Sequence, residues 1–303
     1  MTKEGRALSK TKTGNDRSAY LFIAPFLLFF ALFKLYPMLY GFMVSFLDRN
    51  NARKLSSMAF VGFDNYAKAL SNSTLAASFA HTIVFSLIYT VLVMVLGFLF
   101  AMLYNREFRG RTAARTMFYM PYVTNLIAVG IVFKYLLNPT KGPVNAIFRA
   151  FGFAGPKWLL SPSIALVTVA FIGAWSALAF NVITVLAALQ EIPKDLYEVA
   201  DIEGVTFFQR IRYIVLPMIS PTLFMLLTIT IINSFKNYTT VMGLTGGGPG
   251  TATQVISLLI YEDAFTYMKF SIASAEGVMF TLFIIIVNAL VSKGRSAWER
   301  KIM

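Results

Sequence analysis

The sequence contains no cysteine and a single histidine, His81. Disulfides, thiolate metal sites and iron–sulfur clusters are therefore excluded, and His81 has no second histidine with which to form a metal cluster or a catalytic dyad. The dipeptide Gly-Lys, which a P-loop requires before Ser or Thr, does not occur, and neither does the Gly-x-Ser-x-Gly pattern of a serine nucleophile. We therefore expect no catalytic site, no metal site and no nucleotide site in this chain.

Charge is also scarce, since only 14% of the 303 residues are charged while 57% are hydrophobic. Soluble domains contain about a quarter charged residues. The mean hydropathy of +0.66 is too high for a water-soluble core and indicates that the chain lies in lipid. The net charge of +13 comes from short basic segments beside apolar runs. That distribution argues against a nucleic-acid partner.

Six apolar segments are long enough to cross a membrane. They are 18–46, 79–104, 117–136, 163–189, 215–235 and 270–291. The first is interrupted by Lys34 and Pro37 and is expected to tilt or break near the proline. It does not resemble a cleavable signal, because no small-residue cleavage site follows it. The sequence thus predicts an all-α integral membrane protein with six transmembrane helices.

The distribution of Lys and Arg predicts the orientation. If the N-terminus is cytoplasmic, the inside segments hold 16 Lys and Arg in 64 residues, and the outside segments hold nine in 92 residues. The short second loop contributes most, with Arg106, Arg109, Arg111 and Arg115. Both termini are therefore predicted to be cytoplasmic.

The segment 190–214 between the fourth and fifth spans is hydrophilic but patterned. Ile192, Leu196, Val199 and Ala200 recur at helical spacing, which predicts a short amphipathic helix. Gly204 permits the reversal that a helix C-terminus needs. Thr206 and Gln209 have the spacing of a capping box, which predicts a second short helix, and Phe207, Phe208 and Ile211 give it an apolar face. Such a helix–turn–helix is suited to docking on a partner protein.

This segment resembles the EAA loop of binding-protein-dependent ABC importer permeases. The motif is Glu-Ala-Ala, three residues, Gly, nine residues, Ile-x-Leu-Pro, and this chain departs from it at Val199. The matching residues, expected to form the ATPase-coupling loop, are Glu198, Ala200, Gly204, Ile214, Leu216 and Pro217. The runs APFLLFFALFKLYPMLYGFMVSF, NREFRGRTAARTMFYMPYV and VMGLTGGGPGTATQVISLLIYEDAF are similar to the carbohydrate-uptake branch, which includes maltose, glycerol-phosphate and oligosaccharide permeases. The resemblance covers residues 18–293.

The resemblance implies the type I ABC importer permease fold, in a bacterial or archaeal cell (inner) membrane. It implies a chain that pairs with a second, related permease, two cytoplasmic ATPase subunits and an external solute-binding protein, with ATP and Mg bound by the ATPases. The expected organisation is a cytoplasmic tail (1–17), a first helix with an external loop (18–78), a five-helix core (79–293) containing the coupling loop (190–217), and a cytoplasmic tail (294–303). Glu198 would sit in the ATPase groove.

Candidates for the substrate path are polar or aromatic residues within or beside the spans, because sugars bind to amides, hydroxyls and aromatic rings. They are Trp175, Asn181, Asn233, Asn237, Tyr238 and Glu276. The alternative for the asparagines is polar capping at helix ends. Glu276 is an intramembrane carboxyl and hence a functional candidate, but pairing with Lys34 or Lys134, or a hydrogen bond to a partner permease, would also account for it. Tyr119, Tyr122 and Asn125 are weaker candidates.

The alternatives are a secondary transporter or channel that is not driven by ATP, and a membrane-embedded enzyme. A secondary transporter or channel often shows internal repeats and helices broken at matching positions, and no convincing pair is present. A membrane-embedded enzyme would need convergent acidic or histidine residues in the spans, where Glu276 and His81 are the candidates. The sequence therefore favours a transport subunit.

Overall fold

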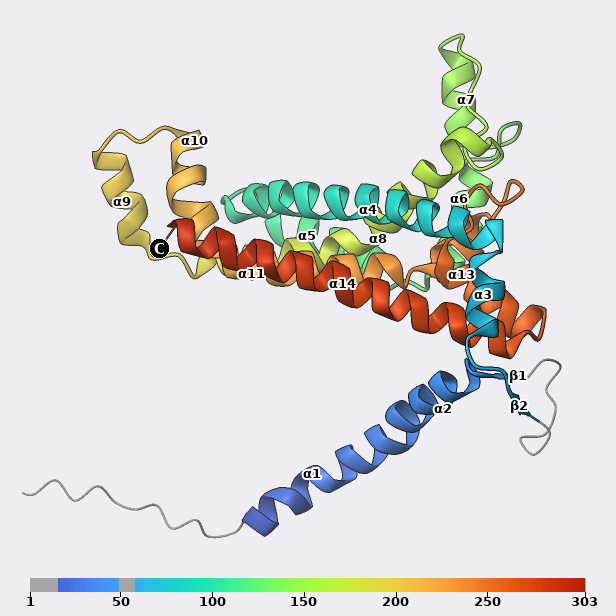
Figure 1. Cartoon of the computed structure of the whole chain (residues 1–303). Helices are drawn as coiled ribbons and strands as arrows, with labels where there is room; N and C mark the ends of the chain where they lie inside the picture. The colour runs from blue at the N-terminus through green and yellow to red at the C-terminus, as the bar shows by residue number, and fades with distance from the viewer. Residues whose placement is uncertain (1–15, 49–57, 303) are drawn as a thin grey trace, which may run out of the picture.

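The structure is a computed structural model that describes residues 16–48 and 58–302. The described chain is a bundle of long helices, with an N-terminal helical segment that projects from one corner (Figure 1). This N-terminal segment consists of α1 (Asp16–Phe30), a π-helical turn η1 (Ala31–Leu35) and α2 (Tyr36–Val44). A two-stranded hairpin, β1 (Leu47–Asp48) with β2 (Ala59–Phe60), and the short α3 (Asp64–Leu70) connect it to the bundle.

The bundle contains the remaining helices. The first half comprises α4 (Ser73–Asn105), α5 (Arg111–Val123), α6 (Leu126–Leu136), α7 (Pro143–Ala150) and α8 (Pro162–Gln190). The second half comprises α9 (Lys194–Ile202), α10 (Phe207–Arg210), the π-helical turn η3 (Ile211–Val215), α11 (Leu216–Phe235), α12 (Tyr238–Leu244), α13 (Ile256–Tyr261), the π-helical turn η4 (Glu262–Thr266) and α14 (Phe270–Ile302).

Five helical segments of the described chain are long and apolar enough to cross a membrane, and a sixth is a bent pair. The five are Tyr20–Val44, Ser73–Asn105, Pro162–Gln190, Phe207–Phe235 and Phe270–Trp298. The pair is α5 and α6, whose axes differ by 102°. The six predicted segments are thus all helical, but the single span predicted at 117–136 is wrong as one straight helix.

The bend between α5 and α6 has a local cause at Asn125. The Asn125 Oδ1 accepts hydrogen bonds from the backbone N–H groups of Ile127 (2.9 Å) and Ala128 (3.3 Å), which starts a new helix. Pro121 lies one turn earlier and removes a backbone donor from the end of α5. A capping residue placed shortly after a proline therefore divides this apolar run.

The predicted interruption of the first segment is confirmed as a π-helical turn rather than a break. The turn η1 ends at Leu35, two residues before Pro37. A proline ring collides with the carbonyl four residues earlier, here that of Phe33 inside η1, and a π-turn absorbs that clash without ending the helix. The predicted tail 1–17 lies outside the described residues except for Asp16 and Arg17, which begin α1.

The core runs along the contact between α4 and α8. The helices approach closely where a Cβ on Gly97 would lie 3.1 Å from the Asn181 Cβ. One buried cluster includes Tyr89, Val93 and Val169, and a second, further along the helices, includes Val182 and Ile219. More than half of the most apolar window of α8 is buried inside the chain. The helix α8 is therefore the centre of the bundle.

The helices α6 and α12 cross at a pair of glycines. A Cβ on Gly130 would lie 2.9 Å from the Gly243 carbonyl carbon and 3.2 Å from its Cα. No side chain fits between the two backbones at that point, so the crossing requires glycine at position 130.

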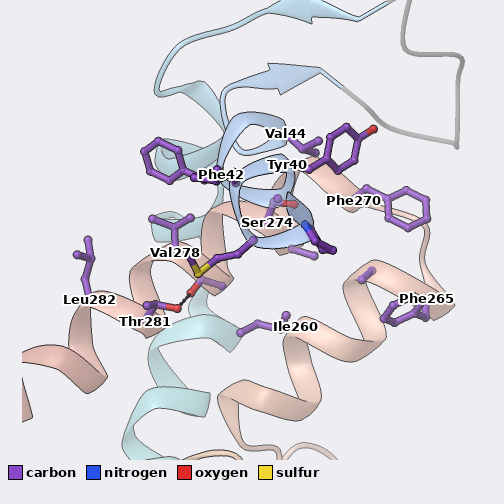
Figure 2. Close-up of a pocket in the computed structure, with 17 residues that line it drawn as sticks. Tyr40, Phe42, Val44, Ile260, Phe265, Phe270, Ser274, Val278, Thr281 and Leu282 are labelled. Carbon is purple, nitrogen blue, oxygen red and sulfur yellow. Dashed lines mark hydrogen bonds between the residues drawn. The ribbon is translucent and has the colours of Figure 1, made fainter. Parts of the chain in front are cut away.

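The last helix extends beyond the predicted span 270–291. The helix α14 continues to Ile302, so the predicted cytoplasmic tail 294–303 is helical up to that residue, and its cytoplasmic location stays a prediction. At its other end, α14 meets α2 across a groove of about 700 Å³ (Figure 2). Phe42, Ile260 and Leu282 are among the apolar side chains around it, and the Thr281 hydroxyl is bonded to the Gly277 carbonyl (2.8 Å). The lining of the groove is mainly apolar, and its polar side chains are Tyr40, Ser274 and Thr281.

Candidate coupling loop and translocation path

The helices α9 and α10 stand together at one end of the bundle, while α7 and α13 lie near the opposite end (Figure 1). In α9, Ala200 is buried and Glu198 is exposed. The helix ends at Gly204, whose φ is +64°. The Val205 N–H donates to the Ala200 carbonyl at 2.9 Å across the turn. The predicted helix and its glycine turn are confirmed, and the left-handed φ explains why glycine occupies position 204.

The predicted capping box at the start of α10 is also confirmed. The Thr206 N–H donates to Gln209 Oε1 at 2.9 Å, and the Gln209 N–H donates to Thr206 Oγ1 at 3.5 Å. Arg210 of α10 pairs with Asp201 of α9, and its guanidinium lies 5.7 Å from the centre of the Tyr197 ring. These contacts tie the two short helices into one unit.

The unit continues directly into α11. Val215, in η3, is buried in the cluster that contains Ile219. Pro217 follows η3 in the same way as Pro37 follows η1, and the π-turn absorbs the clash of its ring with the Tyr213 carbonyl. Ile214 and Leu216 flank Val215 and are half-buried. The helix α10 is therefore joined to α11 through η3 without an intervening loop.

The outward face of this unit is apolar. Ile202 is 85% exposed and Phe208 is 81% exposed. Val199, Phe207 and Tyr213 are exposed beside them. We call these five residues the loop patch. Apolar groups gathered on the surface of an otherwise capped and ion-paired unit indicate a binding surface for another protein.

Trp175 is the substrate-path candidate that faces an open cavity. It lies on α8 with its ring 5.3 Å from that of Phe133 in a T-shaped contact. The cavity, of about 330 Å³, occupies the inside of the α5–α6 bend and is also lined by Met117, Met120 and Thr124. Sequence reasoning missed these three residues, although Pro121 and Asn125 on either side of Thr124 signalled the bend.

The other path candidates are placed differently, and the structure does not bring them together with Trp175. Asn181 is buried at the α4–α8 contact and its Oδ1 has no hydrogen-bond partner within the described chain. Asn237 caps α12 by accepting from the Thr240 N–H at 3.3 Å. Tyr238 stacks on Tyr261 with a ring distance of 5.3 Å. Asn233 is exposed on α11.

Glu276 is enclosed near the α7–α13 end of α14, where its side chain is 0% exposed. The charged groups that interact with it are Asp263 and Lys269, rather than Lys34 or Lys134. Lys269 is 3.4 Å from Asp263. Neither Glu276 oxygen receives a hydrogen bond from a donor in the described chain.

Tyr119 and Tyr122 lie on α5, and Asn125 caps the start of α6. The rings of Tyr119 and Tyr122 are 5.4 Å apart, and Tyr122 stacks on Phe180 of α8 at 5.9 Å. The residues that line the cavity beside Trp175 do not include these three.

The membrane-length helices of the bundle define a polytopic membrane protein, and comparison with known proteins identifies its family. Residues 93–293 match the family model described as "Binding-protein-dependent transport system inner membrane component". The chain belongs to this family of ABC importer permeases, which are transport components rather than enzymes.

Individual relatives cover nearly the whole chain. The sn-glycerol-3-phosphate transport system permease protein UgpA of Agrobacterium fabrum is 31% identical over 271 residues, which are 89% of this chain and 92% of UgpA. The trehalose/maltose transport system permease protein MalF of Thermococcus litoralis is also 31% identical, over 89% of this chain and 91% of MalF. The arabinooligosaccharides transport system permease protein AraP of Bacillus subtilis is 28% identical, over 90% and 87%.

The fold has close counterparts among solved structures. A chain from a bacterial ABC transporter involved in the import of the acidic polysaccharide alginate superposes with a TM-score of 0.82 and 24% identity, covering 92% of this chain and 95% of that one. A second structure of an alginate ABC transporter, in complex with an alginate pentasaccharide-bound periplasmic protein, gives a TM-score of 0.82 and 23% identity, covering 93% and 95%. These likenesses establish the shared fold.

Proposed function

We propose that this chain is one permease subunit of an ATP-driven importer for a sugar or oligosaccharide, and that residues 190–217 couple it to ATPase subunits. Its relatives are named for glycerol phosphate, trehalose or maltose, and arabinooligosaccharides. The observation that carries the coupling role is the α9–α10 unit, which combines an exposed apolar patch with a direct connection to α11.

The proposed assembly contains a second, related permease, two ATPase subunits that bind ATP and Mg, and an external solute-binding protein. Both termini and the α9–α10 unit are on the cytoplasmic side, consistent with the greater density of Lys and Arg in those segments. The membrane is the cell (inner) membrane of a bacterium or archaeon.

The proposed mechanism follows from the geometry of the coupling unit. The loop patch lies in a groove of an ATPase subunit, with Glu198 at its polar rim. Closure of the ATPase pair moves α9 and α10 together, because the Asp201–Arg210 pair and the Gly204 turn keep them in one arrangement. The movement reaches α11 through η3 and changes which side of the membrane the path faces.

The proposed sugar path follows the inside of the α5–α6 bend. Trp175 and Phe133 offer aromatic faces there, and Thr124 offers a polar group at the bend. Aromatic rings combined with a few polar groups are typical of carbohydrate recognition. Alanine substitution of Trp175 should weaken transport at low substrate while leaving assembly intact.

The experiment that tests the coupling role is Gly204→Val in the assembled transporter. A β-branched residue at a left-handed φ costs about 1–2 kcal/mol, so the turn rearranges and the α9–α10 unit loses its shape. We expect coupled transport and its associated ATP hydrolysis to fall about tenfold or more. Gly152→Val is the matched control, since Gly152 also has a positive φ and open space around it. Normal coupling in Gly204→Val would overturn the proposal.

A further inference from the structure

In the helix α7 a polar side chain is buried and apolar side chains are exposed, which is the reverse of the usual pattern in a helix of a soluble protein. Its fully buried side chain is a polar one, Asn145. Exposed apolar residues recur in α7 at every third or fourth position, and they are Pro143, Ala146, Ile147 and Ala150. Phe151, directly after the helix, is 75% exposed. Residues at this spacing share one face of a helix. We call these five residues the α7 stripe; it is an apolar face that the described chain leaves uncovered.

The α7 stripe is held rigidly. The Asn145 amide donates to the carbonyls of Pro139 (3.2 Å) and Pro156 (3.0 Å) and accepts from Trp158 Nε1 (2.7 Å). The rings of Phe148 and Trp158 meet edge to face at 5.8 Å. Trp158 in turn packs against the buried cluster of α4 and α8. The exposure of the stripe is therefore a fixed feature of the fold.

The charge beside the stripe has one sign. Lys141, Arg149 and Lys157 are exposed around α7. No aspartate or glutamate occurs between Glu107 and Glu191. A protein-docking surface usually mixes charges at its rim, whereas an apolar face bordered by cations alone complements anionic phospholipid headgroups above hydrocarbon.

The position of α7 fits a lipid surface. Figure 1 shows α7 projecting sideways from the bundle at the end opposite to α9 and α10, across the direction of the long helices. Because those helices cross the membrane, α7 runs along the membrane surface rather than away from it. Phe153 and Leu160, exposed in the same segment, add further apolar contact at that depth. Amphipathic helices lie in this way, with aromatic groups at the headgroup level.

We propose that the α7 stripe inserts into the membrane surface at this end of the bundle, with Lys141, Arg149 and Lys157 on anionic phospholipid headgroups. The segment is then a lateral anchor that fixes the rotation of the bundle about the membrane normal. The inference requires that the chain spans a membrane and is independent of which solute is carried.

The absence of cysteine makes the test direct, because any engineered cysteine is the single thiol of this chain. An environment-sensitive fluorophore is attached to the cysteine of Ile147→Cys or of Phe151→Cys. Each labelled variant is studied in the assembled transporter, in nanodiscs that contain phosphatidylglycerol. Thr251→Cys, at an exposed position between α12 and α13, is the matched control. We expect a nitroxide lipid to quench the labels at 147 and 151 several-fold more than the label at 251, and iodide to quench in the opposite order.

A second arm tests the headgroup contacts. In Lys141→Gln/Lys157→Gln, lipid quenching of the label at 151 should fall to the value measured in purely zwitterionic nanodiscs. Equal access of iodide to positions 147, 151 and 251 would overturn the proposal. Protection of the stripe that appears only when the solute-binding protein is added would also overturn it, by assigning the stripe to a protein partner. The label at Phe151 lies beyond the last turn of α7 and therefore reports even if the change at Ile147 disturbs the helix.

Discussion

The helices α9 and α7 are both short, both lie outside the spans, and both turn apolar side chains away from the protein. Their surroundings differ in charge. Near α9, Glu198 and Glu203 are exposed and Asp201 pairs with Arg210, whereas α7 is bordered by cations alone. Exposed apolar area alone therefore does not identify the binding partner of a surface. The signs of the neighbouring charges separate a surface for a protein from a surface for lipid.

The largest effect is expected from removing the anchor of α7. Asn145→Leu eliminates three hydrogen bonds and leaves the Trp158 N–H and the Pro156 carbonyl without partners, while the Pro139 carbonyl keeps the hydrogen bond from Arg149 (3.1 Å), so we expect a loss of about 2–4 kcal/mol. Thermal unfolding of the purified protein, with hydrogen exchange of residues 139–158, measures it. Asn233→Leu, at an exposed position, is the control. Unchanged exchange in 139–158 would show that α7 is not held by Asn145.

The next effect should separate the two apolar surfaces. Phe208→Asp places a charge in the loop patch, and a central aromatic contact contributes about 2 kcal/mol or more to binding. ATPase affinity should therefore fall about 30-fold, as measured by titrating the ATPase onto the reconstituted permease pair. Phe153→Asp, on the α7 segment, should leave this affinity unchanged. If both variants weaken ATPase binding equally, the comparison between the two surfaces fails.

A smaller effect is expected within the α9–α10 unit. Arg210→Met removes the ion pair with Asp201, which is partly exposed and contributes up to about 1 kcal/mol. The two short helices should separate more readily, seen as faster hydrogen exchange at 205–210 with global stability nearly unchanged. Lys68→Met breaks the exposed pair with Asp64 on α3 and should leave that exchange unaltered.

The smallest effect concerns pH at the α7–α13 end. Burial raises the pKa of the Glu262 carboxyl; the hydrogen bond from Gln254 (2.7 Å) opposes this, and Asp263 adds to it. A carboxyl whose pKa is higher in the folded state than in the unfolded state stabilises the folded state at acid pH. This contribution to stability is lost as the pH rises through the pKa of the folded state. Glu262→Gln should therefore be more stable than the parent at pH 7, by less than about 0.5 kcal/mol because the carboxyl is only partly buried. The melting temperatures of Glu262→Gln and of the parent, measured between about pH 4 and pH 7, should diverge as the pH rises. A difference that stays constant with pH would contradict a raised pKa at Glu262.

Short-range chemistry made the coupling unit predictable. Gly204, Thr206 and Gln209 act on their own neighbours, so their spacing was enough to predict a turn and a capped helix. The bend at Asn125 obeys the same capping rule, but a continuous apolar run concealed it. Hydrophobicity measures affinity for lipid and does not report whether the backbone changes direction.

Long-range contacts were not predictable from the sequence. Asn237 and Tyr238 have the chemistry of sugar ligands, yet the fold uses them to cap α12 and to stack on Tyr261. The reversed polarity of α7 follows from carbonyls of Pro139 and Pro156 that converge on Asn145 only in three dimensions. A polar residue within an apolar stretch therefore predicts that a partner exists, but not which one.

The glycine crossing of α6 and α12 has a mechanical consequence. Each helix begins just after an interruption, at Asn125 in one case and at Asn237 in the other. Because a Cβ at position 130 would collide with the Gly243 backbone, the two helices pack backbone to backbone, and we expect the two interruptions to move together. In the proposed mechanism, motion that enters from α11 would therefore reach α6 and α12 as one unit.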